Sequence, residues 1–381
     1  MAVRDRLLAI FVVCLLPAEA AVGATQDTTT RAKDAYARAI ELQTQGNNPA
    51  ALSLLWEAAG LAPHDAEVQN RLGEALEQIG ALDAAVEAYR RAVSDRPAFR
   101  KASNNLILAL VKSGKGEEAI DRARALVAAA PDDPDRYFTL GLAQSEQDVS
   151  EAIKSFRRVL DLEPRQTVAR YNLALVLRRA DRLQEALEEL RRALAIDPRP
   201  EVHYTMGIIY WHQGDLDRAA DALRAAVAAE PHYADAHYSL GAVLKAKRDW
   251  PGAAASLRRA VDLRPDLSAA HYTLAQVLLQ RGDESGARKH FDEAERLRHQ
   301  AQLEQEAGVW TAVGTEKLDG GDLQGALGCF RRATTIFEVY APAHYQMGRT
   351  LERLGQRDAA RAAFARARQL NPSLVPPRDS S

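Results

Sequence analysis

The sequence predicts an all-α fold, a superhelical solenoid of about ten helix-turn-helix repeats, on two observations. An alanine returns at steps of 33 or 34 residues, with one longer step, at Ala51, Ala85, Ala119, Ala152, Ala186, Ala219, Ala253, Ala287, Ala326 and Ala360. Between these alanines, apolar residues fall twice per period at helical spacing. A single core rarely extends over 381 residues, whereas a solenoid can, because each repeat contacts only its neighbours.

Residues 233–265 show one repeat most clearly. The small or apolar residues of its first helix share one face, at Ala236, Leu240, Gly241, Val243 and Leu244. The letters KRDWP at 247–251 interrupt this stripe. The second helix carries a stripe at Ala253, Ala254, Leu257, Ala260 and Val261, and Pro265 stops it. Two such short helices cannot bury their apolar faces alone, so we expect neighbouring repeats to cover them.

Small residues also recur where the helices must approach closely. The counterparts of Gly241 are Gly73, Gly141, Gly207, Gly314 and Gly348, with Ala39, Ala174 and Ala275 as small substitutes. Helix axes that pack about 8–10 Å apart require small side chains at the contact. Pro265 recurs as Pro63, Pro97, Pro131, Pro164, Pro198, Pro231 and Pro372. The spacing therefore predicts helix–helix contacts in which leucine-sized neighbours fill the flanking space.

This pattern resembles the tetratricopeptide-repeat (TPR) family, at Leu240, Gly241, Leu244, Ala253, Leu257, Ala260 and Pro265 in the clearest repeat. The resemblance covers roughly residues 32–372. It implies a right-handed superhelix whose first helices line a concave groove, and a generic scaffold for protein or peptide partners. The sequence departs from the family pattern at Arg38 and Ile107, and at His299 and Glu338, which replace the closing proline.

Residues 1–24 have the layout of a signal peptide. Arg4 and Arg6 precede a ten-residue apolar run at 7–16, and small residues place cleavage after Ala20 or Ala24. The run is too short to cross about 30 Å of hydrocarbon as a helix. We therefore expect an exported protein, periplasmic or extracellular, with no stable membrane span once the leader is removed.

The rest of the chain divides by the phase of the repeats. A polar lead-in at 25–31 precedes repeats one to eight at 32–299. Between Ala287 and Ala326 the step is 39 residues, and no Gly or Pro occurs from 287 to 307, which predicts one extended helix with a helical insertion at 300–306. Repeats nine and ten occupy 307–372, and 373–381 is expected to be a disordered tail.

The sequence contains no motif that predicts catalysis, a metal or a cofactor. It lacks a Gly-rich phosphate loop, a cysteine pair for zinc and a His-Glu-x-x-His motif. The formal net charge of −2 gives no reason to expect nucleic acid binding. His203, His237, His271 and His344 share one place in their repeats. Near-translation keeps such side chains too far apart to share zinc, so a packing role is favoured over metal.

The second helices carry paired arginines, of which Arg258-Arg259 is one. A basic patch is one interpretation, but a solvated outer face is favoured. We expect Glu87 and Arg91, and Glu188 and Arg192, to form ion pairs at i,i+4 spacing.

An aromatic row is the strongest functional signal. One position of repeats four to eight is aromatic, at Phe138, Tyr171, Tyr204, Tyr238 and Tyr272. The resemblance places this position in the groove, where tyrosine offers large rigid contact area and a hydroxyl. Helix packing alone is the competing explanation for the row. Polar and aromatic residues expected beside it are Asn172, Arg178, Trp211, His212 and Lys245, which suit an acidic or polar extended peptide.

The resulting hypothesis is an exported, non-enzymatic scaffold that binds protein or peptide partners in the groove. One alternative is a structural assembly factor of a bacterial envelope or polysaccharide-export complex. A third, less favoured, is the repeat region of a glycosyltransferase-type TPR protein without its catalytic domain. The identity of the partner and the oligomeric state stay open.

Overall fold

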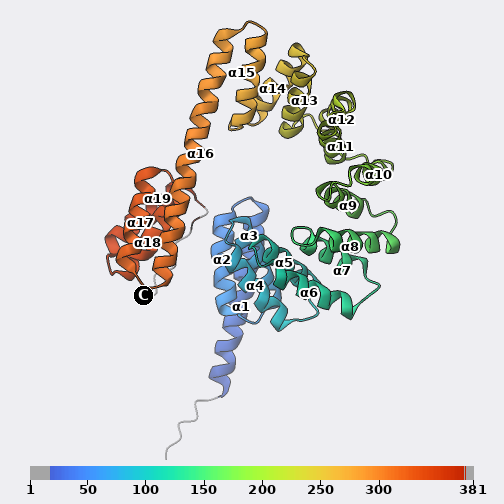
Figure 1. The fold of residues 1–381 in the computed structure, drawn as a ribbon. Coiled ribbons are helices and arrows are strands. Elements are labelled where there is room, and N and C mark those ends of the chain that lie inside the picture. Colours follow the sequence, from blue (N-terminus) through green and yellow to red (C-terminus); the bar gives the residue numbers. More distant parts are fainter. Residues whose placement is uncertain (1–17, 373, 375–381) are drawn as a thin grey trace, which may run out of the picture. The chain divides into compact units, whose positions relative to one another are not determined.

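A computed structural model describes residues 18–372 and 374 (Figure 1). The leader expected at 1–24 lies outside these residues up to residue 17, and the expected tail lies outside them except for Leu374. The polar lead-in expected at 25–31 falls inside the first described helix. All regular structure in the described residues is helical, which confirms the all-α solenoid class.

The chain divides into two compact parts, residues 1–109 and 110–381, with the boundary inside one helix. The first part contains α1 (Ala18–Thr44), α2 (Asn48–Leu61), α3 (Ala66–Gln78), α4 (Leu82–Asp95) and most of α5 (Arg100–Lys112). In the second part, α6 (Gly116–Ala129), α7 (Pro134–Gln144), α8 (Val149–Leu162), α9 (Thr167–Arg179), α10 (Leu183–Leu194), α11 (Pro200–His212) and α12 (Leu216–Ala229) follow the remainder of α5. They are followed by α13 (Ala234–Ala246), α14 (Trp250–Leu263), α15 (Ser268–Gln280), α16 (Glu284–Asp319), α17 (Leu323–Ile336), α18 (Ala341–Arg353) and α19 (Arg357–Leu370).

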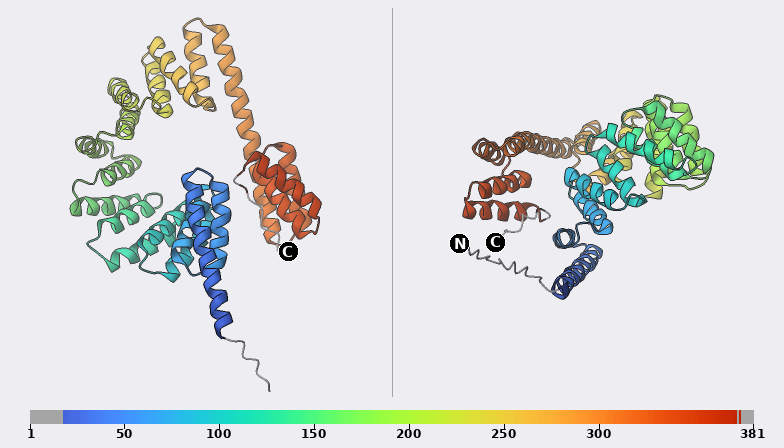
Figure 2. Two further views of the ribbon diagram at one scale, coloured as in Figure 1. Left: turned by 180° about the vertical axis from the view of Figure 1, so that it is seen from behind. Right: turned by 90° about the horizontal axis from the view of Figure 1, so that it is seen from below.

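In the second part, successive hairpins pack side by side (Figures 1 and 2). Up to α15, odd-numbered helices are the first helices of their repeats and even-numbered helices are the second. Each second helix packs against its own first helix and against the first helix of the next repeat, as α14 does with α13 and α15. The largest core cluster runs from Ala152 to Ala287, so the apolar interior is continuous along these repeats.

Within repeats, the turn has a consistent chemistry. Gly214 and Gly282 have φ of +78°, where a residue without Cβ is least strained. The next residue is an aspartate that caps the second helix: Asp215 Oδ1 accepts from the Arg218 N–H at 3.0 Å, and Asp283 Oδ1 from the Gly286 N–H at 2.9 Å. Arg248 takes the glycine's place with φ of +61°.

The recurring glycine of the first helix faces a large side chain of the second. A Cβ on Gly241 would lie 2.5 Å from Leu257 Cγ, and one on Gly314 would lie 2.6 Å from Phe330 Cε1. This contact is the close approach that the spacing of small residues predicts.

Helix α16 is the exception to the hairpin pattern. Its 36 residues span about 54 Å without a turn. The N-terminal portion is the second helix of repeat eight and packs on α15, while the C-terminal portion is the first helix of repeat nine and packs on α17 and α18 (Figure 2). Residues 300–306 lie between these two portions.

Candidate functional site

Successive first helices of the second part are joined directly by side chains. Tyr171 Oη of α9 lies 3.2 Å from Thr205 Oγ1 of α11. Lys245 Nζ of α13 donates to Gln276 Oε1 of α15 at 2.6 Å. Arg179 of α9 donates to the Ser145 carbonyl, at the end of α7, at 2.8 Å. The outward side chains of α7, α9, α11, α13 and α15 therefore form one surface, which we name the first-helix surface.

The aromatic row lies on these helices and has two roles. Phe138, Tyr171, Tyr204 and Tyr238 are half-buried and pack against the core. Phe138 meets Phe156 edge to face, with ring centroids 5.8 Å apart, and Tyr204 lies 5.1 Å from Tyr233. Each of these rings thus packs between helices and still exposes part of its surface to solvent.

Tyr272 is the most exposed member of the row, at 42%. Its ring packs edge to face on Phe291 of α16 at 5.4 Å. The Arg298 guanidinium lies 5.6 Å from its ring centroid, within the range of a cation–π contact.

The predicted polar neighbours are not equally available. Asn172 Nδ2 donates to the Val168 carbonyl of its own helix at 2.8 Å, and Lys245 is held by Gln276. Trp211 is half-buried against the core. Arg178 and His212 are exposed, and neither makes an ion pair with any described residue. They are the polar groups of this set that remain available to a partner.

Two aliphatic side chains of the first-helix surface were missed by the sequence reasoning. Val168 on α9 is 44% exposed, and Leu279 on α15 is 46% exposed. They occupy the positions of Asp235 and Lys245 in the seventh repeat, so an apolar residue at a position that is charged in several other repeats was the available signal.

The histidines have a packing role that repeats. His237 Nε2 donates to the Pro231 carbonyl at 3.1 Å, His271 Nε2 to Pro265 at 3.0 Å, and His344 Nε2 to Glu338 at 2.8 Å. Each bond fixes the loop before the first helix against that helix. No group of three or more metal-ligating side chains occurs among the described residues.

His271 also meets a second histidine. Its Nδ1 lies 3.0 Å from Nδ1 of His290 on α16. Because the Nε2–H of His271 donates a hydrogen bond to the Pro265 carbonyl, Nδ1 of the same tautomer accepts a hydrogen bond from the His290 Nδ1–H. Burial lowers the pKa of His290, and the neighbouring His271 lowers it further.

The paired arginines of the second helices are mostly solvated, but the predicted i,i+4 pairs are wrong. Glu87 pairs with Arg90 at 2.7 Å, and Glu189 pairs with Arg192, both at i,i+3 spacing. A shift of one residue brings the side chains together on the same helix face equally well. Arg258 and Arg259 are exposed.

In the first part, the first helices α3 and α5 carry a polar cluster instead of aromatics. The Glu74 carboxylate accepts from Asn70 at 2.9 Å, Arg71 at 3.0 Å and Asn105 at 3.2 Å, and pairs with Lys101 at 2.7 Å. Burial acts to raise the pKa of Glu74, but these hydrogen bonds and positive charges outweigh it and lower the pKa.

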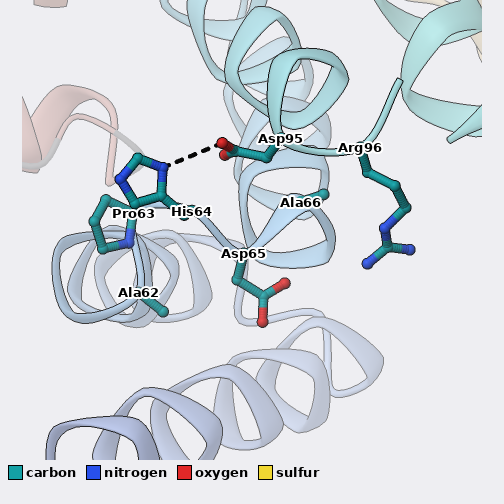
Figure 3. A pocket seen from close by; sticks show the side chains of 7 residues that line it. All are labelled: Ala62, Pro63, His64, Asp65, Ala66, Asp95 and Arg96. Atoms are coloured by element: carbon teal, nitrogen blue, oxygen red, sulfur yellow. Dashed lines mark hydrogen bonds and ion pairs between the residues drawn. The ribbon is translucent and has the colours of Figure 1, made fainter. Parts of the chain in front are cut away.

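A separate hollow of about 430 Å³ lies at the loops that follow α2 and α4 (Figure 3). His64 Nδ1 and Asp95 Oδ1, 3.1 Å apart, close one side of it, and Arg96 lines another part (Figure 3). His64 is exposed to solvent and the hollow is open, so the constellation has neither the burial nor the convergent polar groups of a built ligand site.

No helix in the described part of the chain is both long and apolar enough to cross a membrane.

Comparisons with known families match tetratricopeptide-repeat models to most of the chain. One model matches residues 36–102, 82–134, 204–267 and 243–301, a second matches 143–208, and a third matches 341–374. The first of these alone covers more than half of the sequence.

Solved structures that are similar to this chain include one that shares its fold. A tetratricopeptide repeat protein from Parabacteroides merdae ATCC 43184 is 16% identical with a TM-score of 0.53, over 65% of this chain and 99% of that chain. MamA from Desulfovibrio magneticus RS-1 is 26% identical with a TM-score of 0.39, over 44% of this chain and 95% of that chain. YrrB, described as a TPR protein with an unusual peptide-binding site, is 16% identical with a TM-score of 0.40, over 46% and 91%.

Proposed function

Because the chain belongs to the tetratricopeptide-repeat family, we propose that it is a non-enzymatic scaffold that holds a protein or peptide partner on its first-helix surface. The observation that carries the proposal is the partly exposed aromatic row with exposed aliphatic neighbours. Tyr272, Val168 and Leu279 expose apolar area on helices joined to one another. A few such anchors supply most of the binding energy of an interface.

The chemistry of the surface favours an extended segment with apolar and acidic side chains. Tyrosine rings provide large contact area at little cost in conformational entropy. The exposed guanidinium of Arg178 can pair with a carboxylate in two parallel hydrogen bonds. His212, exposed at the end of α11, adds a donor or acceptor beside Trp211.

We also propose export, on the signal-peptide layout of residues 1–24. Helix α1 begins at Ala18, so cleavage after Ala20 or Ala24 would remove only its first turns and leave the remainder, up to Thr44, in the mature chain. Mass spectrometry of the protein from its native cell should find an N-terminus at Ala21 or Thr25. Recovery of intact Met1 from a cytoplasmic fraction would contradict export.

The binding proposal is tested with partners captured from a native envelope extract, identified and then purified. Changing Tyr204 and Tyr238 together to Ala should weaken binding more than tenfold, because it removes two adjacent anchors. The matched control changes Arg258 and Arg259 to Ala on the second helix. It should alter affinity little, since exposed charges contribute little to affinity.

Circular dichroism should show unchanged helix content in both variants. If the arginine pair matters more than the tyrosines, the partner binds on the second helices and the aromatic row only packs the repeats.

A further inference from the structure

In the regular repeats of the second part, a neighbouring helix covers one apolar face of the first helix. In repeat nine, the equivalent face is exposed. On its first helix, Val309 is 57% exposed and Val313 is 37% exposed. Their counterparts in repeat eight, Ala270 and Leu274, are both 0% exposed. Ala312 and Glu316 are exposed on the same side of α16. We name Val309, Ala312, Val313 and Glu316 the open face.

The exposure follows from the missing turn in α16. In repeats four to eight and in repeat ten, the second helix of the preceding repeat packs on the first helix and covers this face. For repeat nine, the preceding second helix is the N-terminal portion of α16 itself. A continuous helix cannot fold back on its own side, so the covering helix is absent.

The space beside the open face suits a helix of one repeat. Residues 303–319 span about 25 Å, and a second helix of 14 residues, such as α19, spans about 21 Å. The missing neighbour is therefore a second helix of the length that this chain already uses.

Among the described residues, α19 is a second helix that no further repeat covers. Helix α19 ends the array in the described residues, and its outer side exposes Arg361, Ala365 and Arg368. Their counterparts in α14 are Ala254, Arg258 and Val261. Ala254 and Val261 are buried, in a helix that packs against α15.

The charges of the two uncovered sides are complementary. Glu316 in the open face and Glu306 beside it have no ion pair with a described side chain, and Arg368 on α19 is likewise without one, whereas Arg361 pairs with Asp358 of its own helix at 2.6 Å. Where repeat nine has Glu316, other repeats bury an aliphatic residue, such as Val243 or Val277. The exchange of an aliphatic residue for a carboxylate suits a cationic neighbour, and the long arginine stems can cover the valines.

We propose that the open face binds α19 of a second copy of this chain, so that copies associate head to tail. Two open faces packed on each other would instead bring Glu306 and Glu316 of both copies together, and like charges at an interface cost several kcal/mol. A head-to-tail contact joins two different surfaces, so association continues past the dimer or closes into a ring. The contact does not involve the first-helix surface of α7–α15 and does not depend on the proposed function.

The test measures the molar mass of the full chain by light scattering over a range of concentrations. The wild type should rise past twice the monomer mass. An open-face variant, Val309→Asp with Val313→Asp, should stay monomeric. A tail variant, Arg361→Glu with Arg368→Glu, should also stay monomeric. The control Val339→Asp changes a valine that is equally exposed, at 50%, in the loop before α18 and should associate like the wild type.

Mixing the two variants decides the pairing. Each variant keeps the one surface that the other has lost, so an equimolar mixture should form dimers and stop there. Glu316→Arg should weaken association at least tenfold by repelling α19, and the tail substitutions added to it should restore association. Unchanged helix content by circular dichroism confirms that each variant folds.

Three results would overturn the proposal. A wild type that is monomeric at every concentration shows that the copies do not associate. A tail variant that still associates shows that something other than α19 covers the open face. A mixture that stays monomeric shows that the two surfaces are not partners.

Discussion

At the scale of single residues, the contact between Gly241 and Leu257 shows why a small residue recurs in the first helix. A Cβ at Gly241 would lie 2.5 Å from Leu257 Cγ and 3.2 Å from the Ala253 carbonyl oxygen. Gly241→Ala should lower the free energy of unfolding by about 1–3 kcal/mol, because the two helices must move apart. Chemical denaturation measures the change.

Gly328→Ala is the matched control for that substitution. It is also a helical glycine, but no atom lies within 4 Å of its added Cβ. It should stabilise the protein by about 0.5–1 kcal/mol, because alanine loses less backbone entropy on folding. If both alanines have the same effect, the close approach at Gly241 is not what selects the glycine.

Arg248, in the turn between α13 and α14, has a left-handed backbone conformation that lowers the stability of the fold. Its φ is +61°, where a side chain crowds the following carbonyl. Arg248→Gly should raise the free energy of unfolding by about 1 kcal/mol, the penalty that glycine avoids. Gly214→Ala, with φ of +78°, should do the reverse. A loss of stability in Arg248→Gly would show that the arginine side chain contributes more than its backbone costs.

Glu74 links stability to pH in the first part of the chain. Its folded pKa lies below the ordinary value of 4.5. The unfolded chain therefore binds more protons, and the stabilisation is present above pH 4.5 and is lost as pH falls through the folded pKa. Glu74→Gln should be less stable than the wild type at pH 7, and the difference should shrink below pH 4.5. Denaturation experiments across that range measure the difference.

Sequence patterns predicted these residues unevenly. The recurring glycine was found because the close approach of a large side chain from the second helix, such as Leu257, favours a small residue at this position in most repeats. The predicted i,i+4 ion pairs of Arg91 and Arg192 were wrong. A long solvated arginine side chain reaches a carboxylate three residues earlier in a helix as readily as one four residues earlier. The cluster around Glu74 was missed, since Lys101 and Asn105 come from the next repeat and the sequence gives no local sign of their contact with Glu74.

At the scale of elements, α16 depends on unbroken helix across residues 300–306. Gln302→Pro removes a backbone hydrogen bond and places a ring against the carbonyl of Arg298, which costs about 3 kcal/mol. We expect the variant to unfold in two transitions in urea, because repeats nine and ten no longer share a helix with repeat eight. Gln302→Ala keeps the helix and should unfold like the wild type. A single unchanged transition in the proline variant would show that unbroken helix at 300–306 is not what couples repeats nine and ten to repeat eight.

The absence of Gly and Pro from residues 287–307 was enough to predict an extended helix there. The pattern did not predict that Val309 and Val313 are exposed. Burial at these positions requires the second helix of the preceding repeat to pack on them. The periodic sequence predicts such a helix in every repeat, including repeat nine, where the missing turn in α16 leaves none.

At the scale of the whole molecule, a bound partner should leave a footprint on alternate helices. Hydrogen exchange with and without the captured partner should slow in α9, α11, α13 and α15 and stay unchanged in α10, α12 and α14. The reason is that the exposed apolar groups of the first-helix surface lie on the first helices. Protection confined to the second helices would place the partner elsewhere and contradict the proposed function.

Helix α16 also sets a direction. In repeats four to eight a turn reverses the chain before each first helix, so each first helix is antiparallel to the second helices beside it. Since α16 makes no such reversal, the first helix of repeat nine runs with the second helix of repeat eight. Within the second part, the first helix of repeat nine therefore runs in the opposite direction to α15, the first helix of repeat eight. A ligand that follows α7–α15 would meet the first helix of repeat nine running in the opposite direction, so one uninterrupted ligand cannot use the same recognition rule on both.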